Sequence, residues 1–67
     1  MLTTRQLECL YWVMAGKSST DIAAILGISR HTVDEHIAAA CRRLGVRTRT
    51  QAVAEALRLG LLSPSTP

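Results

Sequence analysis

The residues best suited to chemistry in this chain are arginines, and they are concentrated in one third of it. Residues 29–50 contain two acidic residues, Asp34 and Glu35, and five arginines: Arg30, Arg42, Arg43, Arg47 and Arg49. This excess of positive charge equals the net charge of the whole chain, +3, so the remaining charges cancel. A localised basic surface suits a polyanion such as DNA. The alternative is a solvated basic face with no partner.

Hydroxyl side chains form a second chemically distinctive group, because they gather at expected helix starts. The first N–H groups of a helix lack an intrahelical partner, so a helix start rich in hydroxyls favours a phosphate. Serine and threonine at such positions also act as ordinary helix caps. Together with cations in loops and at helix ends, they give the predicted phosphate contacts, which are Lys17, Ser18, Ser19, Thr20, Arg30, Thr32, Arg42, Arg47 and Arg49.

The sequence offers no arrangement for catalysis or for a metal site. His31 and His36 are five residues apart, which does not align them on one helix face, and no CxxC pair is present. Cys9 and Cys41 fall within helical patterns, and we expect two buried thiols rather than a disulfide. No nucleophile–base pair, paired carboxylates or phosphate-cradling glycine loop is visible. We therefore expect no enzyme, no metal and no cofactor.

Length and composition indicate one small domain with a packed core. The chain has 67 residues, of which 48% are apolar. No apolar run approaches the roughly 20 residues of a membrane span, and no charged-then-apolar signal segment begins the chain. We expect a cytoplasmic protein that has no membrane partner.

The pattern of caps and glycines predicts an all-α fold with four helices. The expected helices start at Thr3, near Ser18 or Ser19, at Ser29 and at Thr48, and they end near Ala15, Gly27, Leu44 and Gly60. Gln6 and Gln51 follow their caps by three residues, which is the capping-box spacing. The tail SPSTP contains two prolines, so we assign residues 1–62 to the domain and residues 63–67 to a disordered tail.

The second and third expected helices are joined by a short turn. Only Gly27, Ile28 and Ser29 separate them, which forces the helices to cross steeply, as in helix-turn-helix motifs. At 100° per residue, the inward face of the third helix holds Val33, His36, Ile37, Ala40 and Leu44. The opposite face holds His31, Asp34, Glu35, Ala38 and Arg42, none of them bulky and apolar, and could enter a DNA major groove.

These segments resemble a known family, the LuxR-type (GerE-type) helix-turn-helix domain of bacterial transcription regulators. The residues that carry the resemblance are LTTRQLECL at 2–10, GKSSTDIAAILGIS at 16–29, TVDEH at 32–36, RRLGVRTRTQAV at 42–53 and GLL at 60–62. Trp12, the GKSS turn and Ala40-Cys41 look most like the quorum-sensing branch. In that branch the domain follows a larger acyl-homoserine-lactone-binding domain, which these 67 residues do not include.

The resemblance implies a four-helix bundle that binds double-stranded DNA with its third helix in the major groove. It implies that the start of the second helix and Thr32 hold phosphates, and that positions 34, 35 and 38 face bases. We include His31 with them, so the base-facing set is His31, Asp34, Glu35 and Ala38. The resemblance also implies a dimer through the fourth helix.

The chain departs from the family pattern on this third helix. Lysine or arginine is frequent at the positions of Asp34 and Ala38, and asparagine is common at that of Ala39. On the first helix, Gln6 and Leu7 also replace a usual glutamate and a usual polar residue. A carboxylate facing DNA is repelled by phosphates, but it can accept a hydrogen bond from cytosine N4. We expect DNA binding to persist, with Asp34 and Glu35 selecting a site or weakening the binding.

Two apolar surfaces are candidates for protein contacts. On the fourth helix, Ala52, Ala56 and Leu59 share a side. Because small residues allow two helices to approach closely, this side is the predicted dimer interface. The alternative is that this side packs inward. On the first helix, Leu7 and Tyr11 lie on a flank. This flank is either the edge of the core or an apolar surface that contacts a second subunit or another domain.

Three functional interpretations follow. The first is a transcription-factor domain that docks as a homodimer, or as a heterodimer with another LuxR-type protein, on a two-fold-related DNA site, with RNA polymerase as a further partner. A sigma-factor helix-turn-helix is a related alternative, although His36 and the GLL ending favour the LuxR type. The third is an interaction module that pairs with a full-length regulator and modulates it, with weak or no DNA binding.

Overall fold

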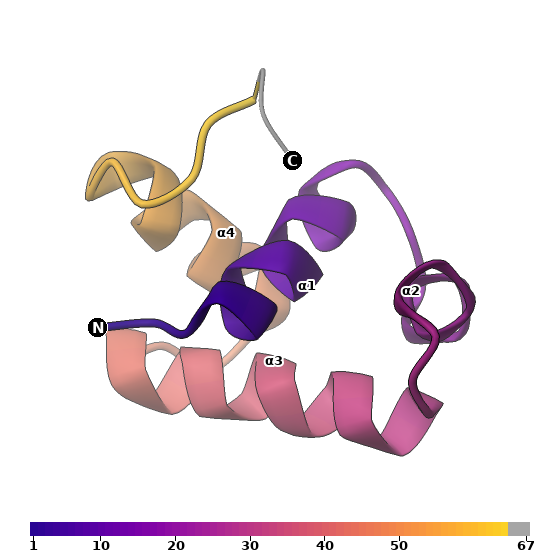
Figure 1. Ribbon diagram of the computed structural model, residues 1–67. Coiled ribbons are helices and arrows are strands. Elements are labelled where there is room, and N and C mark those ends of the chain that lie inside the picture. The colour runs from indigo at the N-terminus through magenta and orange to yellow at the C-terminus, as the bar shows by residue number, and fades with distance from the viewer. Residues whose placement is uncertain (65–67) are drawn as a thin grey trace.

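The computed structural model describes residues 1–64, and these fold into four helices (Figure 1). The helices are α1 (Thr4–Met14), α2 (Ser19–Leu26), α3 (Arg30–Leu44) and α4 (Arg49–Arg58). The predicted all-α, four-helix fold is confirmed. Each predicted helix start is within two residues of the observed one, because the helices begin at local capping signals.

The N-caps of all four helices are the hydroxyl residues that the sequence indicates. Thr3, Ser18, Ser29 and Thr48 each accept a hydrogen bond from the backbone N–H three residues on. Three of these starts are complete capping boxes, in which the side chain at the third helical position bonds back to the cap N–H. Gly27 and Gly45 end α2 and α3 in the left-handed conformation, with φ of 69° and 71°.

The helix-turn-helix is formed by α2 and α3. In Figure 1 α2 is viewed nearly end-on while α3 runs across the view, so the two helices cross steeply. Helix α2 packs mainly on α3, whereas α1 and α4 pack on α3 and on each other. Ile28, the middle residue of the connecting turn, is half-buried against the core.

The core lies between α3 and the other three helices. Its largest fully buried side chains are Leu10, Ile22 and Val33, one from each of α1, α2 and α3. Cys9 and Cys41 are buried there with free thiols, and burial raises the pKa of the Cys9 thiol. Within residues 1–64, none of the four helices is long and apolar enough to cross a membrane.

Burial overturns most of the predicted dimer surface on α4. Ala52 and Ala56 are both completely buried, because their small side chains let α4 approach the rest of the bundle closely. They therefore cannot contact a second subunit, and their assignment to a dimer interface is wrong. Leu59, the third member, is 48% exposed. Leu7 is half-buried against the core, which supports its reading as a core edge.

The predicted tail is described only in part. Ser63 is half-buried and Pro64 is exposed. The disorder predicted for residues 65–67 falls outside the described residues, so it stays a prediction.

Candidate nucleic-acid interface

The outer face of α3 presents a mixed polar surface. Of the four predicted base-facing residues, His31, Glu35 and Ala38 are exposed, whereas Asp34 is half-buried. The His31 Nε2 and Glu35 Oε2 atoms lie 3.3 Å apart, one helical turn from each other. Ala38 adds only a methyl group, and the other side chains are polar, so this face carries no bulky apolar side chain.

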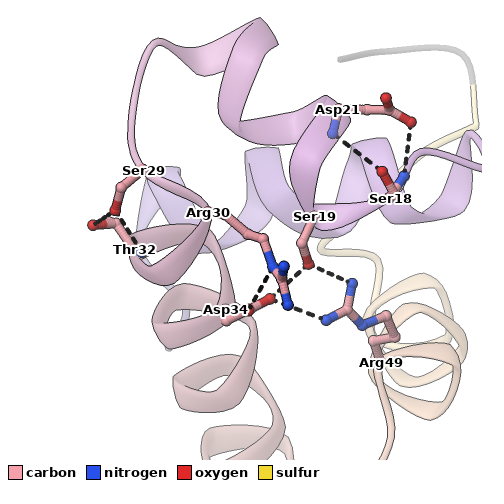
Figure 2. Close-up of polar contacts among 8 residues, drawn as sticks. All are labelled: Ser18, Ser19, Asp21, Ser29, Arg30, Thr32, Asp34 and Arg49. Atoms are coloured by element: carbon pink, nitrogen blue, oxygen red, sulfur yellow. Dashed lines mark hydrogen bonds and ion pairs between the residues drawn. The ribbon is translucent and has the colours of Figure 1, made fainter.

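Asp34 faces two other helices as well as solvent. Its Oδ1 accepts a hydrogen bond from the Ser19 hydroxyl of α2 at 2.6 Å and lies 3.4 Å from Nη2 of Arg49 in α4 (Figure 2). Arg49 Nη1 in turn donates to the Ser19 hydroxyl at 2.9 Å. On the other side, Asp34 Oδ2 lies 3.8 Å from Arg30 Nε. We call Ser19, Asp34 and Arg49 the three-helix polar cluster.

This environment favours the ionised form of Asp34. The Ser19 hydrogen bond contributes most to lowering the pKa of the Asp34 carboxyl, and the hydrogen bond and charge of Arg49 lower it further. The Arg30 charge acts in the same direction. The carboxylate is therefore charged at neutral pH, and both of its oxygens face cations or a hydroxyl of its own chain.

The cations predicted to contact phosphates form two groups, those close to Asp34 and those that lie elsewhere on the surface. Arg30 and Arg49 lie on the side of α3 that displays Asp34 (Figure 2). Lys17, Arg42 and Arg47 are exposed, and Arg42 follows Ala38 by one helical turn on the same side of α3.

Arg43 takes a different direction. Its Nη1 donates to the backbone carbonyl of Met1 at 2.9 Å, so it lies away from this surface. Arg43 adds to the charge of residues 29–50, but it is not one of the predicted phosphate contacts, and this direction agrees with leaving it out.

Three of the four predicted phosphate-binding hydroxyls, those of Ser18, Ser19 and Thr32, have hydrogen-bonding partners within the chain. Ser18 exchanges capping bonds with Asp21, and these bonds lower the pKa of the Asp21 carboxyl. The Thr32 hydroxyl pairs with that of Ser29 at 2.8 Å (Figure 2). Thr20 is exposed at the second position of α2. The cap role of Ser18 is thus observed, and phosphate binding by these residues stays a prediction.

Sequence reasoning missed the three-helix polar cluster. The helical wheel of α3 places Asp34 on the outward side, but it carries no information on which neighbouring helix lies beside it. The spacing of Arg30 and Asp34, one turn apart, was the available local signal of an ion pair. The described residues contain no group of His, Cys, Asp and Glu able to hold a metal ion.

The sequence matches one protein family over most of its length. The family described as bacterial regulatory proteins, luxR family, matches residues 1–56. The chain is 44% identical over 64 residues to the transcriptional activator protein AhyR of Aeromonas hydrophila, covering 96% of this chain and 25% of that protein. It is 43% identical over 61 residues to the transcriptional activator protein LuxR of Aliivibrio fischeri, covering 91% of this chain and 24% of that protein. The chain thus spans about a quarter of these relatives.

Solved structures agree with the sequence comparison. The transcription factor GerE superposes with a TM-score of 0.90 at 42% identity, covering 96% of each chain. The response regulator ChrA of a heme-sensing two-component system superposes with a TM-score of 0.88 at 35% identity, covering 92% of this chain and 31% of the other. Because family, sequence and fold coincide over nearly all of its residues, this chain belongs to the luxR family of bacterial regulatory proteins.

Proposed function

We propose that the chain is a DNA-binding domain that acts in bacterial transcription regulation, with α3 entering the major groove. The observation that carries the proposal is the unobstructed outer face of α3, where His31, Glu35 and Ala38 are exposed beside arginines. Arg30 and Arg49 flank this face from α3 and α4. Arginine contacts to phosphates supply most non-specific affinity, while the exposed polar groups are free to read base edges.

The names of the relatives support this role. AhyR and LuxR are named as transcriptional activators, and RpaR of Rhodopseudomonas palustris, 46% identical over 61 residues, is named as a quorum-sensing-dependent regulator. We propose that the chain serves the same purpose in a cytoplasmic regulator, without catalytic activity and without a cofactor of its own. RNA polymerase is the further partner that such a role implies.

We also propose that two copies associate through the end of α4. Leu57 and Leu59 are 37% and 48% exposed there, and Leu59 lines an apolar pocket of about 290 Å³ together with Leu44 and Leu61. Two copies related by a two-fold axis would place their α3 helices on two half-sites of DNA. In this proposal Leu59 is kept from the predicted dimer surface, and Leu57 replaces the buried Ala52 and Ala56.

A salt titration on random duplex DNA tests the proposed function. The logarithm of the binding constant should fall linearly with the logarithm of salt concentration, by about 0.9 for each phosphate neutralised. Selection of bound sequences from a random library then identifies the site. Absence of binding at low salt would overturn the proposal.

The exposed acid on α3 favours a second candidate function. Glu35 has a 63% exposed side chain on the proposed reading surface, where it would repel phosphates. A domain with such a helix could pair with a full-length LuxR-type regulator through α4 and modulate it. In that case the chain would form a heterodimer with the regulator and show no salt-dependent binding to DNA by itself.

A further inference from the structure

The three-helix polar cluster has the composition of an anion-binding site. A hydroxyl from α2 and a guanidinium from α4 converge on one oxygen, Asp34 Oδ1, at 2.6 Å and 3.4 Å. Ser19 is also the first residue of α2, where the helix dipole favours negative charge. A hydroxyl beside a guanidinium edge is equally suited to a phosphate oxygen.

The three-helix polar cluster is partly accessible from solvent. The side chains of Arg49 and Asp34 are 39% and 41% exposed. They lie on the side of α3 that, under the proposed function, faces DNA (Figure 2). A phosphate of the DNA backbone could therefore reach Ser19 and Arg49, but only where the carboxylate now lies.

We propose that Ser19 and Arg49 form a binding site for a DNA phosphate and that the Asp34 carboxylate occupies it as an intramolecular competitor. Asp34 then lowers the affinity for every DNA sequence to a similar extent instead of choosing among bases. This inference rests on the proposed function, because it assigns a ligand and a regulating residue to the same surface.

Competition explains the geometry better than base reading does. A carboxylate reads cytosine by accepting a hydrogen bond from the N4 amino group. In Asp34, Oδ1 already accepts from Ser19 and faces Arg49, and Oδ2 faces Arg30. Turning this group toward a base would break contacts that stabilise its charge. Ser19 and Arg49, by contrast, lose nothing in hydrogen-bonding partners when a phosphate replaces the carboxylate.

A double-mutant cycle on DNA binding tests the inference. The wild type, Asp34→Ala, Arg49→Ala and the double variant are titrated with several unrelated duplexes over a range of salt concentrations. Asp34→Ala should bind every duplex about threefold to tenfold more tightly, with a salt slope steeper by about 1, because one more phosphate is contacted. In the Arg49→Ala background, Asp34→Ala should give a much smaller gain. Circular dichroism verifies that each variant is folded.

Glu35→Ala provides the matched control. It removes the same charge from the next residue of α3, but Glu35 pairs only with His31 among the ion pairs of the described residues. Its effect on affinity should therefore be the same in the presence and absence of Arg49. The inference is supported if the gain in DNA affinity depends on Arg49 for Asp34→Ala but not for Glu35→Ala.

Three results would overturn the inference while leaving DNA binding intact. A changed ranking of duplexes in Asp34→Ala would identify a base reader. Weaker binding to all duplexes would show that Asp34 positions Arg49 for its contact. An equal gain with and without Arg49 would reduce the effect to general repulsion. If neither the wild type nor any variant binds duplex at low salt, the proposed function itself fails, and the inference with it.

Discussion

Ile22 and Ile25 lie three residues apart on α2, yet Ile22 is completely buried and Ile25 is 44% exposed. The difference defines how α2 is rotated on the bundle, with Ile22 in the core and Ile25 toward solvent. Since both residues have the same side chain in one short helix, comparing them measures how much burial contributes to the free energy of unfolding.

Replacement of the buried isoleucine should cost far more stability than replacement of the exposed one. Ile22→Ala removes a fully buried side chain and should lower the free energy of unfolding by about 2–5 kcal/mol. Ile25→Ala should lower it by less than about 1 kcal/mol. Urea denaturation followed by circular dichroism measures both, and similar losses would contradict the observed orientation of α2.

The left-handed glycine at the end of α2 should resist replacement by alanine. Gly27 has a φ of 69°, and a Cβ there would meet no neighbouring atom within 4 Å, so any penalty comes from the backbone alone. Gly27→Ala should lower the free energy of unfolding by about 1–2 kcal/mol. Gly27→Asn should cost less, because asparagine tolerates this conformation better. Equal losses in the two variants would argue against a backbone origin.

Stability should fall in acid, and Asp34 should account for part of the fall. The folded state lowers the pKa of the carboxyls of Asp34, Asp21 and Glu55. A lowered pKa stabilises the fold above the unfolded value of about 4, and this stabilisation is lost as pH drops through the folded pKa. The free energy of unfolding of Asp34→Asn should therefore depend less on pH between about 5 and 2 than that of the wild type. A parallel pH profile would show that Asp34 is not involved.

Exposed arginines should differ in their effect on DNA binding according to their position. Arg47 is exposed in the loop before α4, and Arg47→Ala should weaken binding to all duplexes and reduce the salt slope by about 1. Arg58, at the other end of α4, is paired with Glu55 in two hydrogen bonds, and Arg58→Ala should leave the slope unchanged. Fluorescence titrations at several salt concentrations measure both slopes. Equal slopes in the two variants would remove Arg47 from the interface.

Self-association should depend on the exposed end of α4. Leu59→Lys introduces a charge at a side chain that is 48% exposed, so it should dissociate a dimer while leaving the monomer folded. Ala52→Lys inserts a charge into the core and should unfold the chain instead. Analytical ultracentrifugation with circular dichroism separates these outcomes. A Leu59→Lys protein that associates as the wild type does would place the interface elsewhere.

The parts of the structure that depend only on residues close together in the sequence were predictable from it. The caps Thr3 and Thr48 were correct because a capping box is complete within four residues. The assignment of Ala52 and Ala56 was wrong because a helical wheel separates the sides of a helix without showing which one faces the core. The cluster of Ser19, Asp34 and Arg49 needs three helices in place, so no local pattern contains it.

The contact between Arg43 and the Met1 carbonyl holds the first residue beside the last turn of α3 (Figure 1). Asp34 lies nine residues earlier on the same helix, which at 1.5 Å per residue is about 14 Å away along its axis. A dye or affinity handle joined ahead of Met1 would consequently emerge at the opposite end of α3 from Ser19 and Arg49. A label at this terminus therefore stays clear of the Ser19 hydroxyl and the Arg49 guanidinium.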